Sequence, residues 1–176
     1  MSAEPVDPDL QLGNAVHRGL YRALTVDEVE ALKINGTAHV ELLHGRLLVT
    51  PIGDIEHQTL SVQLLQRLLV DLPPGHRVLT GVNVYDGENV KVIPDVVVID
   101  PERAIRDGKG VGPDGLILAV EITSPSNRST DVVDKRELYE AWGVPYLLVD
   151  RSFDPHRYLA YGQWPAWQGA QDILTP

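Results

Sequence analysis

The sequence has 176 residues and a mass of 19.4 kDa, which suits one domain and leaves no room for two full ones. Hydrophobic residues make up 43% and charged residues 23%, which excludes a disordered chain, and the absence of cysteine excludes disulfides and thiolate chemistry. The net charge of −10 has the wrong sign for a basic scaffold that holds nucleic acid by bulk electrostatics, although an enzyme that binds phosphates through a divalent cation can be acidic.

The N-terminal segment, residues 1–20, contains prolines and acids without periodicity, so we predict a flexible arm. This arm lacks the basic and apolar regions of a signal peptide, and no apolar run in the chain approaches 18 residues. We therefore expect a cytoplasmic protein with no membrane partner. The following pattern, Thr25-Val26-Asp27-Glu28, is typical of a capping box and predicts a short helix.

Two clear patterns come next along the chain. The run 40–49 has His44-Gly45 at its middle, between arms rich in Leu and Val, which predicts two strands joined by a tight turn. From 55 to 72 leucines recur at helical spacing until the Pro-Pro-Gly sequence that follows, which predicts a helix over this whole range.

The second half of the sequence alternates between short β-prone runs and one further helix. A polar, Gly-rich segment, 101–115, predicts a loop between two strands. Within it the stretch 108–112 lacks the spacing of a phosphate-binding P-loop, and we expect it to be mobile and able to meet substrate. Thr130 or Asp131 can cap a helix that ends near Trp142, because Gly143 stands where a C-cap glycine belongs. The predicted strands after residue 72 are 77–84, 90–92, 96–99, 116–121, 145–149 and 158–161.

This order of elements predicts an α/β or α+β fold with one sheet and its helices, over residues 21–161. The C-terminal tail, 162–176, carries two tryptophans and two prolines. We expect it either to pack as a coil or to cover an oligomer contact.

The first candidate functional residues are two acids in apolar strands. Asp95 precedes one strand and Glu121 closes another, and a carboxylate buried there needs a cation or hydrogen-bond partners. On neighbouring strands the two could share a metal ion. The alternative is that Asp95 makes a local turn and Glu121 pairs with an arginine at a sheet edge.

The helix after Glu121 supplies a lysine on its apolar face. At 100° per residue, Lys135 falls in the same arc as Leu138, Tyr139 and Trp142. Its ammonium either snorkels to solvent and pairs with a nearby Asp, or lies beside Glu121 and a metal, where it stabilises charge on a phosphate. Tyr139, one turn further, points the same way.

Two more polar residues are ambiguous. His57 lies on the predicted buried side of the helix 55–72, where a lone histidine is either a core residue or a ligand. Glu41 lies in a predicted strand and faces either solvent or a site.

Together these motifs resemble the Uma-two family, a bacterial group of restriction-endonuclease-like proteins in the PD-(D/E)xK nuclease superfamily. The resemblance covers roughly residues 25–150. Its motifs are Glu41-Leu42-Leu43-His44-Gly45, His57, Pro94-Asp95, Glu121-Ile122-Thr123-Ser124-Pro125-Ser126, Asp131 with Lys135 and Tyr139, Gly143-Val144-Pro145-Tyr146 and Asp150.

The resemblance implies a restriction-endonuclease-like core, in which a mixed β-sheet flanked by helices carries a divalent-metal site at its edge. Asp95 matches the first metal carboxylate of the superfamily motif and Glu121 the second. The lysine expected two residues after the second acid is replaced by Thr123, and Lys135 matches the lysine that this family carries on the next helix. Glu41 and His57 match additional polar residues of the same pocket.

The main functional hypothesis is therefore a DNA endonuclease that uses Mg²⁺ or Mn²⁺, held by Asp95, Glu121 and the Ile122 carbonyl. In it Lys135 stabilises the transition state, and His57 or Glu41 takes a proton or anchors a second ion.

Two other hypotheses stay open. One is a non-catalytic nuclease-fold regulatory or assembly module, favoured by Thr123 and the acidic charge, and the other is hydrolysis of a small phosphoester. A homodimer is a further hypothesis, because cutting a duplex needs two cleavage events.

Overall fold

The computed structural model describes residues 17, 22–32, 38–106, 110–123 and 130–174. The arm predicted for 1–20 lies outside these residues apart from His17. The chain divides into two compact units, which are described separately: the first contains 1–52 and 86–92, the second 53–85 and 93–176. In the described part of the chain, none of the helices combines the length and apolar character needed to cross a lipid bilayer.

The first unit contains the predicted capping box and hairpin. The Thr25 hydroxyl accepts a hydrogen bond from the Glu28 amide, and the Glu28 carboxylate accepts one from the Thr25 amide, so the box is confirmed at the start of α2 (Val26–Glu30). Strands β1 (Ala38–Leu43) and β2 (Arg46–Pro51) pair antiparallel around His44 and Gly45, both at positive φ. Strand β5 (Val90–Val92) pairs antiparallel with β1.

The second unit is built on a five-stranded sheet with the strand order β11-β10-β9-β6-β3. Strands β9 and β10 run parallel, while the other neighbours are antiparallel, so the predicted mixed sheet is confirmed. The strands are β3 (Arg77–Thr80), β6 (Val96–Ile99), β9 (Leu116–Ile122), β10 (Tyr146–Asp150) and β11 (Arg157–Tyr161).

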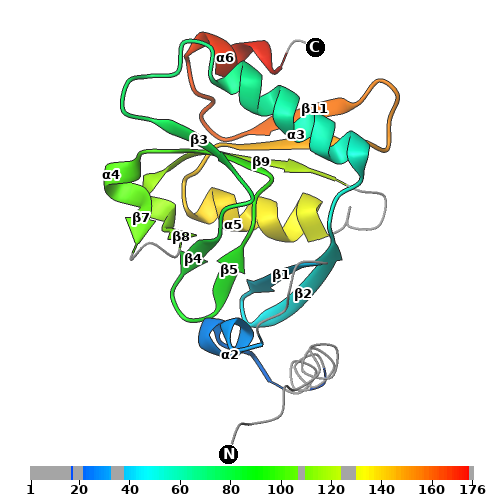
Figure 1. The fold of residues 1–176 in the computed structure, drawn as a ribbon, viewed down its shortest axis with the longest axis vertical. Helices are drawn as coiled ribbons and strands as arrows, with labels where there is room; N and C mark the ends of the chain where they lie inside the picture. The colour runs from blue at the N-terminus through cyan, green and yellow to red at the C-terminus, as the bar shows by residue number, and fades with distance from the viewer. Residues whose placement is uncertain (1–16, 18–21, 33–37, 107–109, 124–129, 175–176) are drawn as a thin grey trace, which may run out of the picture. The chain divides into compact units, whose positions relative to one another are not determined.

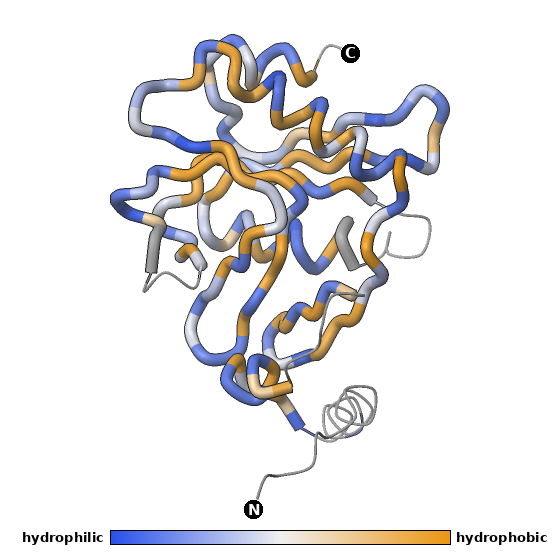
Figure 2. Tube along the Cα trace, viewed as in Figure 1, coloured by the Kyte–Doolittle hydropathy of each residue, from blue (hydrophilic) through white to orange (hydrophobic). Residues whose placement is uncertain are grey.

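Helices cover both faces of this sheet. Figure 1 shows α3 (Ile55–Leu68) and α6 (Gln168–Asp172) on one face and α5 (Arg136–Ala141) on the other. Alternate residues of the strands meet α3 and α6 in a fully apolar layer, and Figure 2 shows the apolar character of the strands. The buried members of this core are Leu60, Leu64, Leu68, Val96, Val98, Leu118, Val120, Ile122, Leu147, Val149, Ala170 and Ile173.

Three segments differ from the sequence predictions in extent. Helix α3 ends at Leu68 because the chain turns through Asp71 at positive φ before the prolines are reached. The strand predicted over 77–84 breaks at Gly81, whose φ of +59° interrupts the extended backbone, and resumes in β4 (Val84–Asp86). The helix predicted from residue 130 is confirmed, but its first part, Thr130–Lys135, is π-helical.

The prediction of a loop over 101–115 was wrong for most of its length. The structure has α4 (Pro101–Ala104), the short pair β7 (Ile105–Arg106) and β8 (Gly110–Val111), and a 3₁₀ turn (Pro113–Gly115). A Cβ on Gly115 would lie 2.3 Å from the Ala104 Cβ, so glycine allows this segment to fold back on α4. Residues 107–109 lie outside the described set.

The C-terminal tail forms α6 instead of a coil and packs on α3. The Trp167 indole donates a hydrogen bond to the Leu68 carbonyl, and the Gly169 amide donates one to the Val70 carbonyl. Ile173 is fully buried. The amphipathic pattern of so short a helix is too weak to recognise in the sequence, because packing against α3 provides most of its stability.

Adjacent leucines at the end of α3 test this packing. Leu68→Ala should lower the free energy of unfolding by about 2–5 kcal/mol, because Leu68 is fully buried. Leu69→Ala should lower it by less than about 1 kcal/mol, because Leu69 is 51% exposed. Urea unfolding measures both, and equal losses would contradict the described core.

Candidate active site

Asp95 lies immediately before β6 and is bonded across to β9. Its Oδ2 accepts a hydrogen bond of 2.7 Å from the Ile122 amide, and its Oδ1 lies 3.2 Å from Nε2 of His57. Strands β6 and β9 pair Val96 with Val120, so this register continued by one residue sets Asp95 opposite Glu121. The carboxylate is therefore held between two elements that are distant in sequence.

Glu121 belongs to the central strand β9 and faces α5. Its Oε1 accepts hydrogen bonds from Nζ of Lys135 at 3.1 Å and from the Tyr139 hydroxyl at 2.9 Å. All three residues are at most 3% exposed. The lysine ammonium thus lies against Glu121 inside the fold and does not snorkel to solvent.

The backbone of the helix explains how both donors reach the same oxygen. Lys135 ends the π-helical segment and Tyr139 lies four residues later in α5, so both project from one side of the helix. Short π-helical segments are rare and occur frequently at functional sites. The π-helical segment therefore sets the position of Lys135 relative to β9, and the contact of Lys135 with Glu121 depends on that position.

Burial makes the charged pair energetically demanding. Removing a carboxylate and an ammonium from water costs several kcal/mol for each ion, which their attraction repays only if the remaining hydrogen-bond groups are satisfied. The Tyr139 hydroxyl adds such a bond. Replacing Glu121 and Lys135 by two hydrophobic residues of similar volume would leave the folded protein equally stable or more stable.

His57 comes from the first turn of α3, where Asp54 caps the helix by accepting a bond from the His57 amide. The hydrogen bond with Asp95 raises the pKa of His57 above its usual value of 6.5, while burial opposes that rise. Its Nδ1 is buried and has no hydrogen-bond partner among the described residues. A Cβ at Gly53 would lie 2.4 Å from Nδ1, so glycine makes room for the ring.

Arg151 is a further polar residue of this region that the sequence interpretation did not single out. It follows β10, its side chain is 6% exposed, and its guanidinium bonds Asp54 at 2.9 Å and also Glu56. Its Nε is buried without a partner among the described residues. The available signal was its position after Asp150, at the carboxyl end of a buried strand next to β9.

The remaining predicted residues have different surroundings. Thr123 is fully buried and accepts a hydrogen bond from the Arg151 amide, so the position of the missing lysine serves strand association instead. The Ile122 amide binds Asp95, and the role of its carbonyl stays a prediction. Glu41 is buried in β1 of the first unit, and its part in the site also stays a prediction.

The His, Asp and Glu side chains of this region can be compared with the ligands that different metal ions require. Among the described residues, no group of three or more His, Asp or Glu side chains is arranged to hold one. A closed zinc cage is therefore not formed by them. Mg²⁺ usually keeps several waters and needs only one or two carboxylates, and Mn²⁺ also prefers oxygen ligands. Asp95 and Glu121, opposite each other at the ends of two strands, fit such an ion.

Comparison with known proteins agrees with this fold. The profile of the Uma2 family, described as "Putative restriction endonuclease", matches residues 26–160, which confirms the resemblance to the Uma-two family. A crystal structure described as a "putative nuclease belonging to DUF820 from Anabaena variabilis ATCC 29413" has a TM-score of 0.61 and 18% sequence identity. The similarity covers 85% of this chain and 92% of that one, and at this identity it shows the fold. No curated protein matches the sequence.

Removal of the buried lysine charge tests the Glu121 cluster. Lys135→Met should destabilise the protein by about 3–5 kcal/mol, because it leaves a buried carboxylate without its cation. The double variant with Glu121→Gln should recover part of this loss, and Arg136→Met on the exposed side should cost about 1 kcal/mol or less. Denaturant unfolding provides all three values, and strictly additive losses would argue against the pair.

Titration tests the His57 contact with Asp95. In metal-free protein the pKa of His57 should exceed 6.5, and Asp95→Asn should lower it because the hydrogen bond to a carboxylate, the largest cause of the rise, is lost while burial still opposes the charged imidazole. A raised pKa means that the contact stabilises the fold fully below pH 6.5 and that this contribution is lost as the pH rises through the folded-state pKa. NMR of the imidazole protons in EDTA measures the value, with Glu137→Gln as an exposed control that should leave it unchanged.

Proposed function

Because this chain belongs to the Uma2 family, we propose that it is an endonuclease that hydrolyses phosphodiester bonds in DNA with Mg²⁺ or Mn²⁺. The observation that carries the proposal is the buried contact of Glu121 with Lys135 and Tyr139, one residue from the Ile122 amide that binds Asp95. A fold stabilised only by packing gains little from a charged group at this depth, whereas a site for phosphate chemistry requires carboxylates and a cation together.

The proposed metal ligands are Asp95, Glu121 and the Ile122 carbonyl. When bound, Mg²⁺ or Mn²⁺ polarises a phosphodiester and lowers the pKa of a bound water. The Ile122 amide and His57 fix the orientation of the Asp95 carboxylate. Lys135 and Tyr139 do the same for Glu121, so neither acid has to reorganise when a cation arrives.

The roles of the other groups follow from their surroundings. Lys135 adds a fixed positive charge beside Glu121, where it stabilises negative charge that develops on a phosphate. In the proposal His57 exchanges a proton at Nε2, since its hydrogen bond with Asp95 raises its pKa above the ordinary value of 6.5.

The net charge of −10 bears on how DNA would be held. Bulk electrostatics oppose the approach of a polyanion, so affinity has to come from the divalent cation and from local contacts. We include in the proposal a homodimer, in which two copies cut the two strands of a duplex.

Plasmid cleavage tests the proposal. Wild type should nick supercoiled DNA with Mg²⁺ or Mn²⁺ and not with EDTA, and Glu121→Gln and Asp95→Asn should each lower the rate at least about 100-fold. The matched control is Glu137→Gln, an exposed acid on α5, which should retain the wild-type rate. Circular dichroism confirms that each variant folds.

Two results would contradict this function. Cleavage that survives both Asp95→Asn and Glu121→Gln would place the activity elsewhere. Absence of cleavage by folded wild type on plasmid and single-stranded DNA would favour a non-catalytic nuclease-fold module, which the buried Thr123 in place of a lysine supports.

A further inference from the structure

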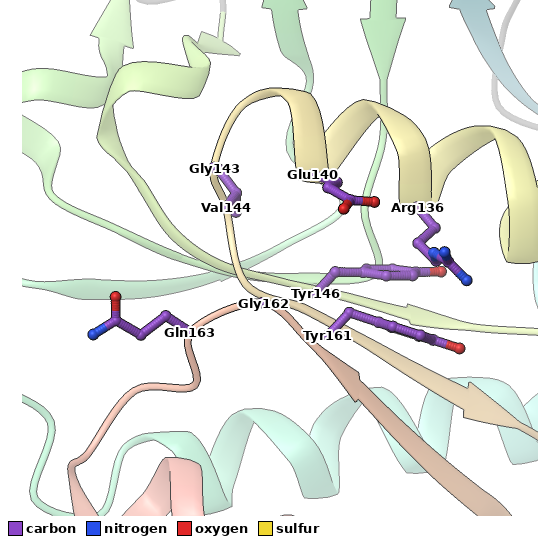
Figure 3. Close-up of a pocket in the computed structure, with 8 residues that line it drawn as sticks. All are labelled: Arg136, Glu140, Gly143, Val144, Tyr146, Tyr161, Gly162 and Gln163. Carbon is purple, nitrogen blue, oxygen red and sulfur yellow. The ribbon is translucent and has the colours of Figure 1, made fainter.

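A pocket of about 240 Å³ lies in the second unit, at the carboxyl end of α5. Figure 3 shows it between this helix end and the strands β10 and β11. Its lining includes the side chains of Arg136, Glu140, Tyr146, Tyr161 and Gln163. None of these residues takes part in the contacts of Asp95, Glu121 or Lys135 described above.

Aromatic rings connect this pocket with the proposed active site. The ring of Tyr139, whose hydroxyl binds Glu121, stacks on Tyr146 with centroids 5.1 Å apart. Tyr146 in turn stacks on Tyr161 with centroids 5.8 Å apart and an interplanar angle of 17°. Tyr146 is almost fully buried, whereas Tyr161 lies half-buried on the edge strand β11. The stack therefore ends in a ring that lines the pocket.

The polar groups of the pocket also have a particular arrangement. The guanidinium of Arg136 lies over the Tyr161 ring, 4.9 Å from its centroid. Figure 3 shows Arg136 and Glu140, one helical turn apart, on the side of α5 that borders the tyrosines. Gln163 adds an amide on the opposite side, in the segment after β11. The pocket thus combines the planar guanidinium of Arg136 and the tyrosine rings with the Glu140 carboxylate, which can accept hydrogen bonds.

We propose that this pocket binds a nucleobase of the nucleic-acid substrate, an inference that rests on the proposed function. Bases stack on tyrosine rings and on arginine guanidinium planes, whatever their sequence. The pocket is smaller than the 300 Å³ or more that is usual for drug-sized ligands, which suits a single base. On the inner side of the helical segment 130–141, Lys135 and Tyr139 then act on the phosphate, while Arg136 and Glu140 on its outer side hold a base.

Glu140 gives the pocket a preference among the bases. A carboxylate accepts hydrogen bonds from the exocyclic amino groups of adenine, cytosine and guanine, whereas thymine has no such group and offers the carboxylate only its N3–H. The carboxylate also offsets the positive charge of Arg136, so the pocket as a whole has little net attraction for a phosphate. Binding should therefore depend on the base and not on the phosphate.

NMR titration with deoxynucleoside monophosphates tests the proposal in EDTA, where no metal-dependent cleavage occurs. We expect saturable shifts of the Gly143 and Gly162 amides with dAMP, dCMP and dGMP, weaker binding of dTMP, and no binding of deoxyribose 5-phosphate. Arg136→Gln should raise the Kd about tenfold, the effect of losing a stacking contact. Tyr161→Leu should act in the same direction.

Arg157 provides a matched control. It is an exposed arginine that lies over the ring of Phe153, 3.5 Å from its centroid, and it does not line the pocket. Arg157→Gln should leave the Kd unchanged. Equal weakening by Arg157→Gln and Arg136→Gln, equal binding of deoxyribose 5-phosphate, or the absence of saturable shifts would each overturn the proposal, and equal affinity for dTMP would overturn the role of Glu140.

The two proposals fail in different ways. Base binding that depends on Arg136, without cleavage of any DNA, would support the pocket and overturn the endonuclease. Cleavage that depends on Glu121, without base binding that depends on Arg136, would support the endonuclease and overturn the pocket.

Discussion

Burial of the Glu121 carboxylate is the constraint on which the second unit depends. A charge on the central strand of a sheet requires a cation that reaches it from outside the strand, and here Lys135 does so from the segment that connects β9 to β10. The parallel pairing of these strands in turn requires a crossover connection, and that crossover carries Lys135, Tyr139 and the outer residues Arg136 and Glu140. The segment between β9 and β10 therefore supplies both the cation that Glu121 requires and the crossover that the parallel strands require.

The end of β9 collects polar groups from both faces of the sheet. Asp95 arrives from the antiparallel neighbour β6, His57 from α3 on one face, and Lys135 from the helix on the other. The parallel neighbour β10 adds Arg151, whose amide binds Thr123. Each group is fixed by an element with its own hydrophobic contacts, so the geometry of the site is maintained by the apolar core of the unit.

Most of the fold could be predicted because the patterns were local. The capping box at Thr25, the hairpin turn at His44-Gly45 and the leucine period of α3 all depend on residues within one or two turns of each other. The features that were missed depend on tertiary contacts: α6 owes its stability to α3, and Gly115 folds back on Ala104. Four residues of the candidate site could be identified because they are polar residues in or beside apolar sequence patterns. They are Asp95, Glu121, Lys135 and Tyr139. Arg151 was missed, because its position after a strand is a weak signal until its partners Asp54 and Glu56 are known.

The sheet order also determines when the proposed site can exist during synthesis of the chain. The central strand β9 is joined on one side by β6, which is made before it, and on the other by β10, which is made after it. A nascent chain that ends before residue 146 would have Glu121 and Lys135 but no β10 to pair with β9, and α3 would lack α6. These late, non-local contacts slow folding. The apolar core that holds the site residues in place would therefore be complete only after the last strands and α6 have emerged from the ribosome.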